Sequence, residues 1–185
     1  MDSIPVHALW LAQDDPKKNT AVLASKRGDL TLHKNIRSLP KRGVILEPLC
    51  GKVFGPEDHE LLTQRGGALV GLDCSWAHIE TSVESVMKRT RLQPRMLPLL
   101  LAANPVNWGK PGRLTTAEAL ATVLYLVGRR DQAADVLGAF RWGGRFFELN
   151  REPLDAYASA TSSQQLVDLQ FDFFDIERPT EDDEP

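Results

Sequence analysis

The sequence predicts an α/β domain with a parallel sheet over residues 1–94, an all-α domain over residues 95–176 and an acidic, disordered tail over residues 177–185. Three observations support this prediction. Short apolar runs alternate with helix signals in the first half, whereas the second half is rich in leucine and alanine and lacks strand-like runs. The 185 residues are 42% hydrophobic and 25% charged, which is enough apolar material for a sizeable core. Seven acids and one base occupy positions 172–185, a composition that favours disorder.

In the first half, three apolar runs are typical of short buried strands: residues 7–12, 44–46 and 68–72. A helix is expected over residues 56–64, because Pro56 and two acids occupy its first turn, where proline and negative charge are favoured. Strand, helix and strand at this spacing indicate a parallel sheet.

In the second half we expect four helices, over residues 94–103, 115–130, 131–140 and 164–169. The second gives the clearest signal. Thr115 or Thr116 can cap it, Glu118 lies in its first turn, and Arg129 and Arg130 end it.

Charge is distributed unevenly along the chain. Residues 17–42 carry eight bases and one acid, and residues 87–113 carry six bases and no acid, although the net charge of the whole chain is −3. This asymmetry permits a surface that faces nucleic acid, but a charge run alone more often marks a solvated surface with a disordered tail.

Several classes of protein are excluded or disfavoured. No apolar run approaches the roughly 18 residues that a membrane span needs, and the first ten residues have neither a basic region nor a cleavage site typical of a secretory signal. Cys50 and Cys74 suit a reducing compartment, so we expect a cytoplasmic protein without a membrane partner. The four histidines are isolated and lack metal-ligand spacing, so no metal is expected.

Three segments are candidates for chemistry. Residues 73–76 (DCSW) follow an expected strand, where the ligand crevice of a parallel sheet opens, although Asp73 could equally cap a turn and Trp76 could lie in the core. Residues 95–111 contain a loop rich in proline and asparagine that can grip a ligand through its main chain or merely connect two helices. Residues 112–116 precede the clearest helix, whose N-terminal N–H groups can bind an anion.

Taken together, these segments resemble the small-subunit (16S/18S) rRNA aminocarboxypropyltransferase family. The matching stretches run in the family's order over nearly the whole chain before the acidic tail: DPKKNT (15–20), LEP (46–48), LDCSW (72–76), RMLPLLLAANPVNWGKP (95–111), LTTAEALA (114–121) and FRWGGRFFELN (140–150). The long run at 95–111 is the most specific of them.

The resemblance implies a SPOUT-like fold with a deep trefoil knot. It also implies transfer of the 3-amino-3-carboxypropyl group of S-adenosylmethionine to N3 of an N1-methylpseudouridine in small-subunit rRNA, with release of methylthioadenosine. The expected partner is small-subunit rRNA or a pre-ribosomal subunit, and the basic segments would face its phosphates. We expect a monomer.

The resemblance also assigns site residues. Asp73 would be the catalytic base or an orienting group. Thr20 and the backbone of Thr116 would hold the carboxylate of the transferred group, and Trp76 would pack beside the sulfonium. The remaining contacts would be the main chain of Leu72 at the ribose and an adenine pocket lined by Leu46, Pro48, Leu97 and its neighbours.

Three residues depart from the family pattern. Asn19 stands where cysteine is frequent, Trp108 replaces a commoner tyrosine, and Gly112 stands where many members place an aromatic residue that contacts the ligand. The glycine could loosen the grip on the cofactor or transfer that contact to Trp108. A methyltransferase with the same cofactor and a non-catalytic ribosome-assembly factor remain the alternative functions.

Overall fold

A five-stranded parallel sheet, in the order β2-β1-β4-β3-β5, forms the centre of the first half of the chain. The structure is a computed structural model and describes residues 3–178, except for the side chain of Trp76. Most of the expected acidic tail therefore lies outside the described residues. The strands are β1 (Val6–Trp10), β2 (Thr31–His33), β3 (Val44–Leu46), β4 (Leu69–Asp73) and β5 (Gln93–Arg95).

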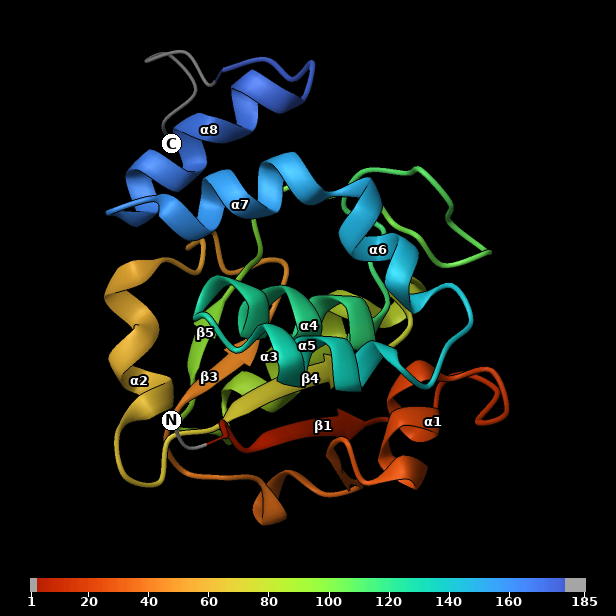
Figure 1. Ribbon diagram of the computed structural model, residues 1–185. Coiled ribbons are helices and arrows are strands. Elements are labelled where there is room, and N and C mark those ends of the chain that lie inside the picture. The colour runs from red at the N-terminus through yellow and green to blue at the C-terminus, as the bar shows by residue number, and fades with distance from the viewer. Residues whose placement is uncertain (1–2, 179–185) are drawn as a thin grey trace.

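Helices cover both faces of this sheet (Figure 1). On one face, Val6, Ala8 and Leu69 pack in the larger core cluster with apolar residues of α4 (Thr116–Leu126). On the other face, Leu9 and Val70 pack with Val86 of α3 (Ile79–Met87) in a smaller cluster. The helices of the first half are α1 (Thr20–Arg27), α2 (His59–Thr63) and α3 (Ile79–Met87), with short 3₁₀ turns at Ile36–Ser38, Pro56–Asp58 and Trp76–His78.

The second half is helical after residue 115. It comprises α4 (Thr116–Leu126), α5 (Arg130–Leu137), α6 (Gly143–Leu149), α7 (Arg151–Ser159) and α8 (Ser163–Phe173). Helix α4 packs against β4, and α6, α7 and α8 form a further layer on the side of α4 away from the sheet (Figure 1). No helix within residues 3–178 has the length and hydrophobicity needed to cross a membrane.

The α/β class and the parallel sheet are confirmed, and the expected strands at residues 44–46 and 68–72 lie within one residue of β3 and β4. The expected helix over residues 94–103 is wrong. Residues 93–95 form the edge strand β5, and the chain then stays extended, with bridges at Met96 and Leu101. Pro94 and Pro98 disfavour helix. The segment is rich in leucine because it is half-buried to buried, and not because it is helical.

The expected helix over residues 115–130 is too long. Helix α4 ends at Leu126, because Gly128 adopts a left-handed conformation (φ 78°) and redirects the chain. Arg130 consequently begins α5, so Arg129 and Arg130 lie at the start of the next helix rather than at the end of α4. Helices α1, α3, α6 and α7 and strand β2 were not predicted from the sequence.

Candidate functional site

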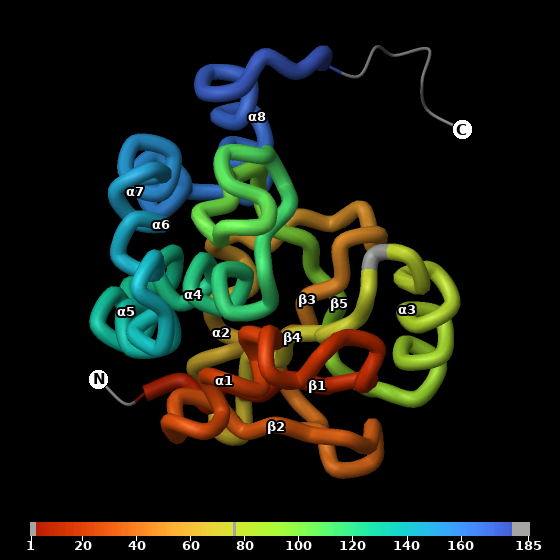
Figure 2. Tube along the Cα trace, turned by 90° about the vertical axis from the view of Figure 1, so that its right-hand side faces the viewer, coloured from red at the N-terminus to blue at the C-terminus, as the bar shows by residue number. Residues whose placement is uncertain are grey.

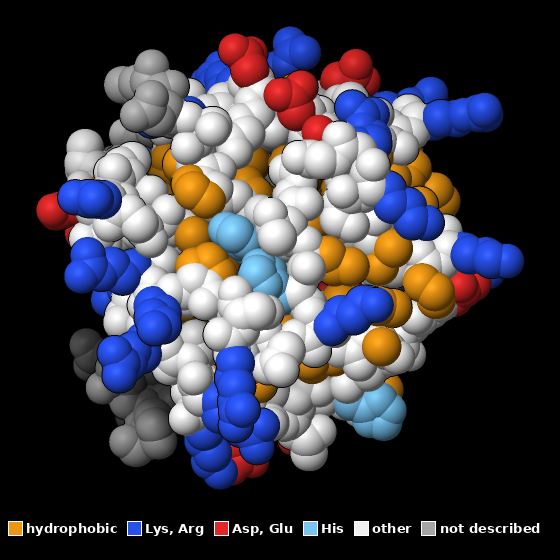
Figure 3. Space-filling model, turned by 90° about the horizontal axis from the view of Figure 1, so that it is seen from below, with side chains coloured by type: hydrophobic (Ala, Val, Ile, Leu, Met, Phe, Trp, Pro, Cys, Tyr) orange, Lys and Arg blue, Asp and Glu red, His pale blue; other side chains and the backbone are white. Residues whose placement is uncertain are grey.

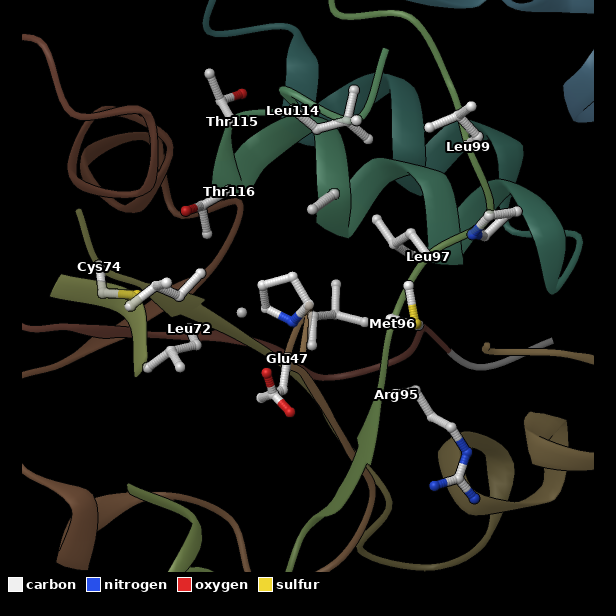
Figure 4. Close-up of a pocket in the computed structure, with 17 residues that line it drawn as sticks. Glu47, Leu72, Cys74, Arg95, Met96, Leu97, Leu99, Leu114, Thr115 and Thr116 are labelled. Carbon is white, nitrogen blue, oxygen red and sulfur yellow. The ribbon is translucent and has the colours of Figure 1, made fainter. Parts of the chain in front are cut away.

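A cavity of about 290 Å³ lies at the carboxyl edge of the sheet, between the ends of β3 and β4 and the start of α4. This volume is near the lower end of the roughly 300–1,000 Å³ that is usual for small-molecule sites. Figure 4 shows its walls, which are formed by residues 46–48, 71, 72, 74, 79, 95–99, 112, 114–116 and 119. The lining is predominantly apolar.

The structure brings most of the predicted site residues to this cavity. Its walls include six of them: Leu46, Pro48, Leu72, Leu97, Gly112 and Thr116. Thr20 and Asp73 do not line the cavity, but both contact the start of α4 beside it. Trp76 begins a 3₁₀ turn two residues after Cys74, and its side chain lies outside the described part of the structure.

Asp73 is the last residue of β4 and its carboxylate is buried. Thr116 Oγ1 donates to Asp73 Oδ1 (2.6 Å), and Asn19 Nδ2 donates to Asp73 Oδ2 (2.5 Å). The Asn19 amide is fixed because its Oδ1 accepts the Val22 N–H as the N-cap of α1. Burial raises the pKa of Asp73, and the two hydrogen bonds oppose that rise by stabilising the charged form.

The start of α4 is the second polar feature of the site. Thr115 caps the helix, and its backbone N–H and hydroxyl both donate to Glu118 in a capping box. Thr20 Oγ1 accepts the Ala117 N–H (3.3 Å), which joins α1 to α4. The N–H groups of Thr115, Ala117 and Glu118 thus have acceptors within the protein. The Thr116 N–H and the helix dipole are what this helix start offers to an anion next to the cavity.

Gly71 allows α4 to lie this close to the sheet. A Cβ atom on Gly71 would come within 2.8 Å of Thr116 Cγ2 and 3.4 Å of Leu120 Cδ2. The absence of a side chain at this position of β4 thus brings Thr116 within hydrogen-bonding distance of Asp73, two residues further along the strand.

The extended segment 96–101 forms another wall, and distant side chains satisfy its backbone. Leu99 donates its N–H to Gln170 Oε1 (2.7 Å), and its carbonyl accepts the Tyr157 hydroxyl (3.0 Å). Leu101 exchanges two hydrogen bonds with the Asn150 side chain (2.8 and 2.9 Å). Helices α7 and α8, together with the residue before α7, therefore hold this wall in a shape that the segment does not specify by itself.

Sequence reasoning gave no individual role to several lining residues. Cys74, Met96 and Leu114 belong to its candidate segments, whereas Glu47 and Ala119 lie outside all three segments. Glu47 is buried and accepts the Leu49 N–H (2.5 Å). The sequence signal that could have identified Glu47 as a lining residue is its position between Leu46 and Pro48, which were both assigned to the adenine pocket. Burial raises the pKa of Cys74 to about 11, so this thiol stays protonated at neutral pH.

One expected phosphate-facing base is not available at the surface. Arg95 is buried and forms an ion pair with Asp58, with its Nη2 atom 2.7 Å from Asp58 Oδ1. This pair joins the end of β5 to the turn before α2. Within residues 3–178, no cluster of three or more His, Cys, Asp or Glu side chains is arranged to bind a metal ion.

The fold and the cavity define an α/β protein that binds a small molecule at the carboxyl edge of a parallel sheet. Residues 44–174 match the family described as "Ribosome biogenesis protein, C-terminal".

Two relatives are 16S rRNA aminocarboxypropyltransferases of archaea. That of Methanothermobacter thermautotrophicus is 41% identical over 86% of this chain and 92% of the relative, and that of Methanopyrus kandleri is 42% identical over the same shares. The solved structure of the SAM-dependent rRNA:acp-transferase Tsr3 from Vulcanisaeta distributa superimposes with a TM-score of 0.78 at 38% identity, covering 88% of this chain and 86% of that one. The chain belongs to the 16S rRNA aminocarboxypropyltransferase family.

Proposed function

We propose that this protein transfers the 3-amino-3-carboxypropyl group of S-adenosylmethionine to N3 of an N1-methylpseudouridine in small-subunit rRNA and releases methylthioadenosine. The relatives are named for aminocarboxypropyl transfer to 16S rRNA, and the structural neighbour is described as SAM-dependent. The observation that carries the proposal in this chain is the buried Asp73 carboxylate, bonded to Thr116 at the edge of an apolar cavity.

The described residues fit S-adenosylmethionine. Leu46, Pro48 and Leu97 offer an apolar wall to adenine, and the main chain of Leu72 borders the position proposed for the ribose. Thr20 and the Thr116 backbone stand at the helix start that favours the carboxylate. Gly112 lines the cavity without a side chain, and Trp76 remains the proposed neighbour of the sulfonium.

Bound S-adenosylmethionine supplies an electrophilic carbon next to a sulfonium, which is already an activated leaving group. Asp73, beside the cavity, would accept the N3 proton as N3 bonds to this carbon and the thioether leaves with the electron pair of the carbon–sulfur bond. The burial that raises the pKa of Asp73 makes it a stronger base than an exposed carboxylate. Asn19 and Thr116 fix the orientation of the Asp73 carboxylate. We expect most of the rate enhancement to come from the alignment of N3 with the carbon that it attacks.

Exposed bases support the proposal of an rRNA partner. The segment 17–42 carries Lys and Arg side chains that are all exposed. Lys and Arg side chains are spread over the face that Figure 3 shows, with few acidic side chains among them, and the segment after α1 runs along this lower side of the molecule (Figure 1). Removal of these charges should lower RNA affinity and flatten its salt dependence.

We propose the finer architecture on the same resemblance: a SPOUT-like fold with a deep trefoil knot, a change of domain near residue 95 and a cytoplasmic monomer. Residue 95 is the last residue of the sheet, and the chain beyond it leads into the helical half. Stretching the chain from both termini would test the knot, because a knotted chain keeps a contour length short of full extension. Sedimentation would test the monomer.

A label-transfer experiment on small-subunit rRNA tests the function. With carboxyl-labelled S-adenosylmethionine we expect label in the RNA, and with methyl-labelled cofactor we expect none. Methyl label alone would make the protein a methyltransferase, and no transfer of either label to correctly premodified RNA would favour an assembly factor.

The variant Asp73→Asn tests the proposed base. It keeps the size of the side chain but cannot accept the N3 proton, so we expect transfer to slow by about 10²–10⁴-fold, the usual contribution of a positioned acid or base. Cofactor binding, measured by calorimetry, should stay within a few-fold of wild type. Unchanged transfer would remove Asp73 from the chemistry.

A further inference from the structure

The chain between the cavity wall and α4 forms a narrow excursion, residues 104–111, which we call the rim finger. Its two sides are joined at the base by hydrogen bonds from the Ala102 N–H to the Lys110 carbonyl (3.1 Å) and from the Gly109 N–H to the Ala102 carbonyl (2.8 Å). An antiparallel bridge between Leu101 and Pro111 closes the same base. The rim finger is therefore an ordered, hydrogen-bonded element and not merely a flexible connection.

A buried carboxylate anchors the finger from below. Glu118 of α4 is fully buried, and its Oε1 atom accepts the N–H groups of Ala103 (2.7 Å) and Asn104 (3.1 Å). The Asn104 side chain donates to Glu118 Oε2 (2.9 Å) and accepts the Asn107 N–H (3.0 Å). Hydrogen bonds to a charged group are stronger than neutral ones, so this anchor holds the direction in which the finger projects.

The tip of the finger exposes apolar side chains. Val106 is 84% exposed and Trp108 is 51% exposed, and they are two of the four large hydrophobic side chains that the described residues expose. A third, Leu49, is 51% exposed and follows the cavity residues Glu47 and Pro48. Val106 and Trp108 lie two residues apart on the same finger beside the cavity, and exposed apolar side chains in such a place mark a surface that binds a partner.

The finger stands directly beside the cavity. Gly112, Leu114 and Thr115, which follow it, line the cavity, as does Leu99, which precedes it. Figure 2 looks onto the carboxyl edge of the sheet and shows the segment of residues 97–115 above the start of α4, on the side of the loops that follow β1 and β4. A molecule that reaches the cavity from this side passes the finger.

The proposed reaction determines which molecule must pass the rim finger to reach the cavity. N3 of a uracil-type base lies on its pairing edge, so the acceptor must be unpaired and turned out of any helix before it reacts. Single-stranded RNA presents its bases to aromatic side chains, on which they stack, while lysine and arginine follow its phosphates. Lys110 is exposed on the finger, and the sequence has no acid between Met87 and Arg113.

We propose that the rim finger is a stacking platform for a nucleotide adjacent to the acceptor, with the Trp108 ring receiving the base and Lys110 facing a phosphate. This inference rests on the proposed function, because it takes the rRNA acceptor from it. It makes Trp108 a residue that positions substrate rather than cofactor.

Binding measurements test the platform without relying on turnover. The probe is a single-stranded fragment of small-subunit rRNA that contains the acceptor, and its affinity is measured by fluorescence anisotropy at several salt concentrations. Trp108→Ala should weaken binding by about 5- to 150-fold, which is the range for loss of one base–aromatic stack. Trp108→Phe should restore most of the affinity, because a phenyl ring still stacks.

Two comparisons separate stacking from other roles. Lys110→Ala should lower the slope of log affinity against log salt by about one unit, whereas Trp108→Ala should leave that slope unchanged. Both variants should bind S-adenosylmethionine in calorimetry and unfold thermally as wild type does.

An abasic scan locates the stacked nucleotide. At one position next to the acceptor, removal of the base should weaken binding of wild type and have no further effect on Trp108→Ala. Equal RNA affinity of wild type and Trp108→Ala would overturn the platform. Loss of affinity for whole small subunits with unchanged affinity for the fragment would also overturn it, in favour of a protein contact. A failure of aminocarboxypropyl transfer is read in the label assay and leaves these binding results interpretable.

Discussion

Glu118 is the residue on which the site's irregular backbone depends most. Its Oε1 atom accepts two backbone N–H groups, from Ala103 and Asn104, and its Oε2 atom accepts the Thr115 N–H (2.7 Å), the Thr115 hydroxyl (2.9 Å) and Asn104 Nδ2. One carboxylate thus caps α4, anchors the rim finger and fixes residues next to the cavity. The substitution Glu118→Gln tests this arrangement with almost no change in size.

The expected loss follows from the donors. A glutamine amide keeps one acceptor oxygen and places an NH₂ group at the other position. All five donors lose a charged acceptor, and in either orientation at least two of them lose their acceptor oxygen altogether. Each hydrogen bond to a charged group contributes about 1.5–3 kcal/mol, so we expect the free energy of unfolding to fall by about 3–6 kcal/mol. This is a large part of the roughly 5–15 kcal/mol that stabilises a typical domain.

Urea denaturation followed by tryptophan fluorescence measures this loss as a shift in midpoint at constant slope. Glu148→Gln is the matched control, because Glu148 is exposed on α6 and its substitution should change stability by less than about 0.5 kcal/mol. Thr115→Ala removes only the capping hydroxyl and should cost about 1 kcal/mol. A loss below about 1 kcal/mol for Glu118→Gln would show that the carboxylate does not anchor the finger.

Three further substitutions probe the fold around the site. Gly71→Ala should push the start of α4 from the sheet and weaken S-adenosylmethionine binding about tenfold or more in calorimetry, whereas Gly144→Ala, which has open space around it, should not. Arg95→Met leaves the buried Asp58 carboxylate without its ion pair and should cost about 3–5 kcal/mol in urea unfolding, and adding Asp58→Leu should recover part of it. Burial lowers the pKa of His7 from 6.5 to about 4. Between these pH values His7 is protonated in the unfolded chain but not in the native state, so the free energy of unfolding should fall as the pH is lowered from 6.5 to 4. His7→Gln should flatten this dependence of Tm on pH, and parallel curves for both proteins would contradict it.

The sequence predicts the three central strands β1, β4 and β3, because local signals and tertiary burial agree there, and it misses the edge strands β2 and β5. Residues 44–46 and 69–73 are short apolar runs, and a central parallel strand, covered on both faces, requires such a run. The start of α4 is predicted for the same reason, since Thr115 and Glu118 form a capping box that is local in sequence. Helices α6 and α7 carry weaker end signals, and neither has a side-chain N-cap hydrogen bond.

The candidate site is predicted less by pattern than by resemblance. Composition and spacing mark Asp73 as a residue at the end of a strand, but they do not reveal that Asn19 and Thr116 meet it from two helix starts. These contacts span 54 and 43 residues of sequence. The side-chain amide that holds Asp73 comes from a residue that stood out only as a departure from a family pattern.

The apolar segment 96–103 explains both the wrongly expected helix and the position of the cavity. Residues 96–103 are apolar and rich in leucine, as a buried helix would be, yet they form no helix, and residues 96–99 line the cavity. An extended segment away from a sheet leaves N–H and C=O groups unpaired, which burial makes costly. Here Gln170, Asn150, Tyr157 and Glu118 supply the missing partners from four places in the helical half. The helical half therefore does more than cover the sheet. Its side chains keep residues 99–103 in a conformation that is neither helix nor regular strand. Both the cavity wall and the base of the rim finger depend on this conformation.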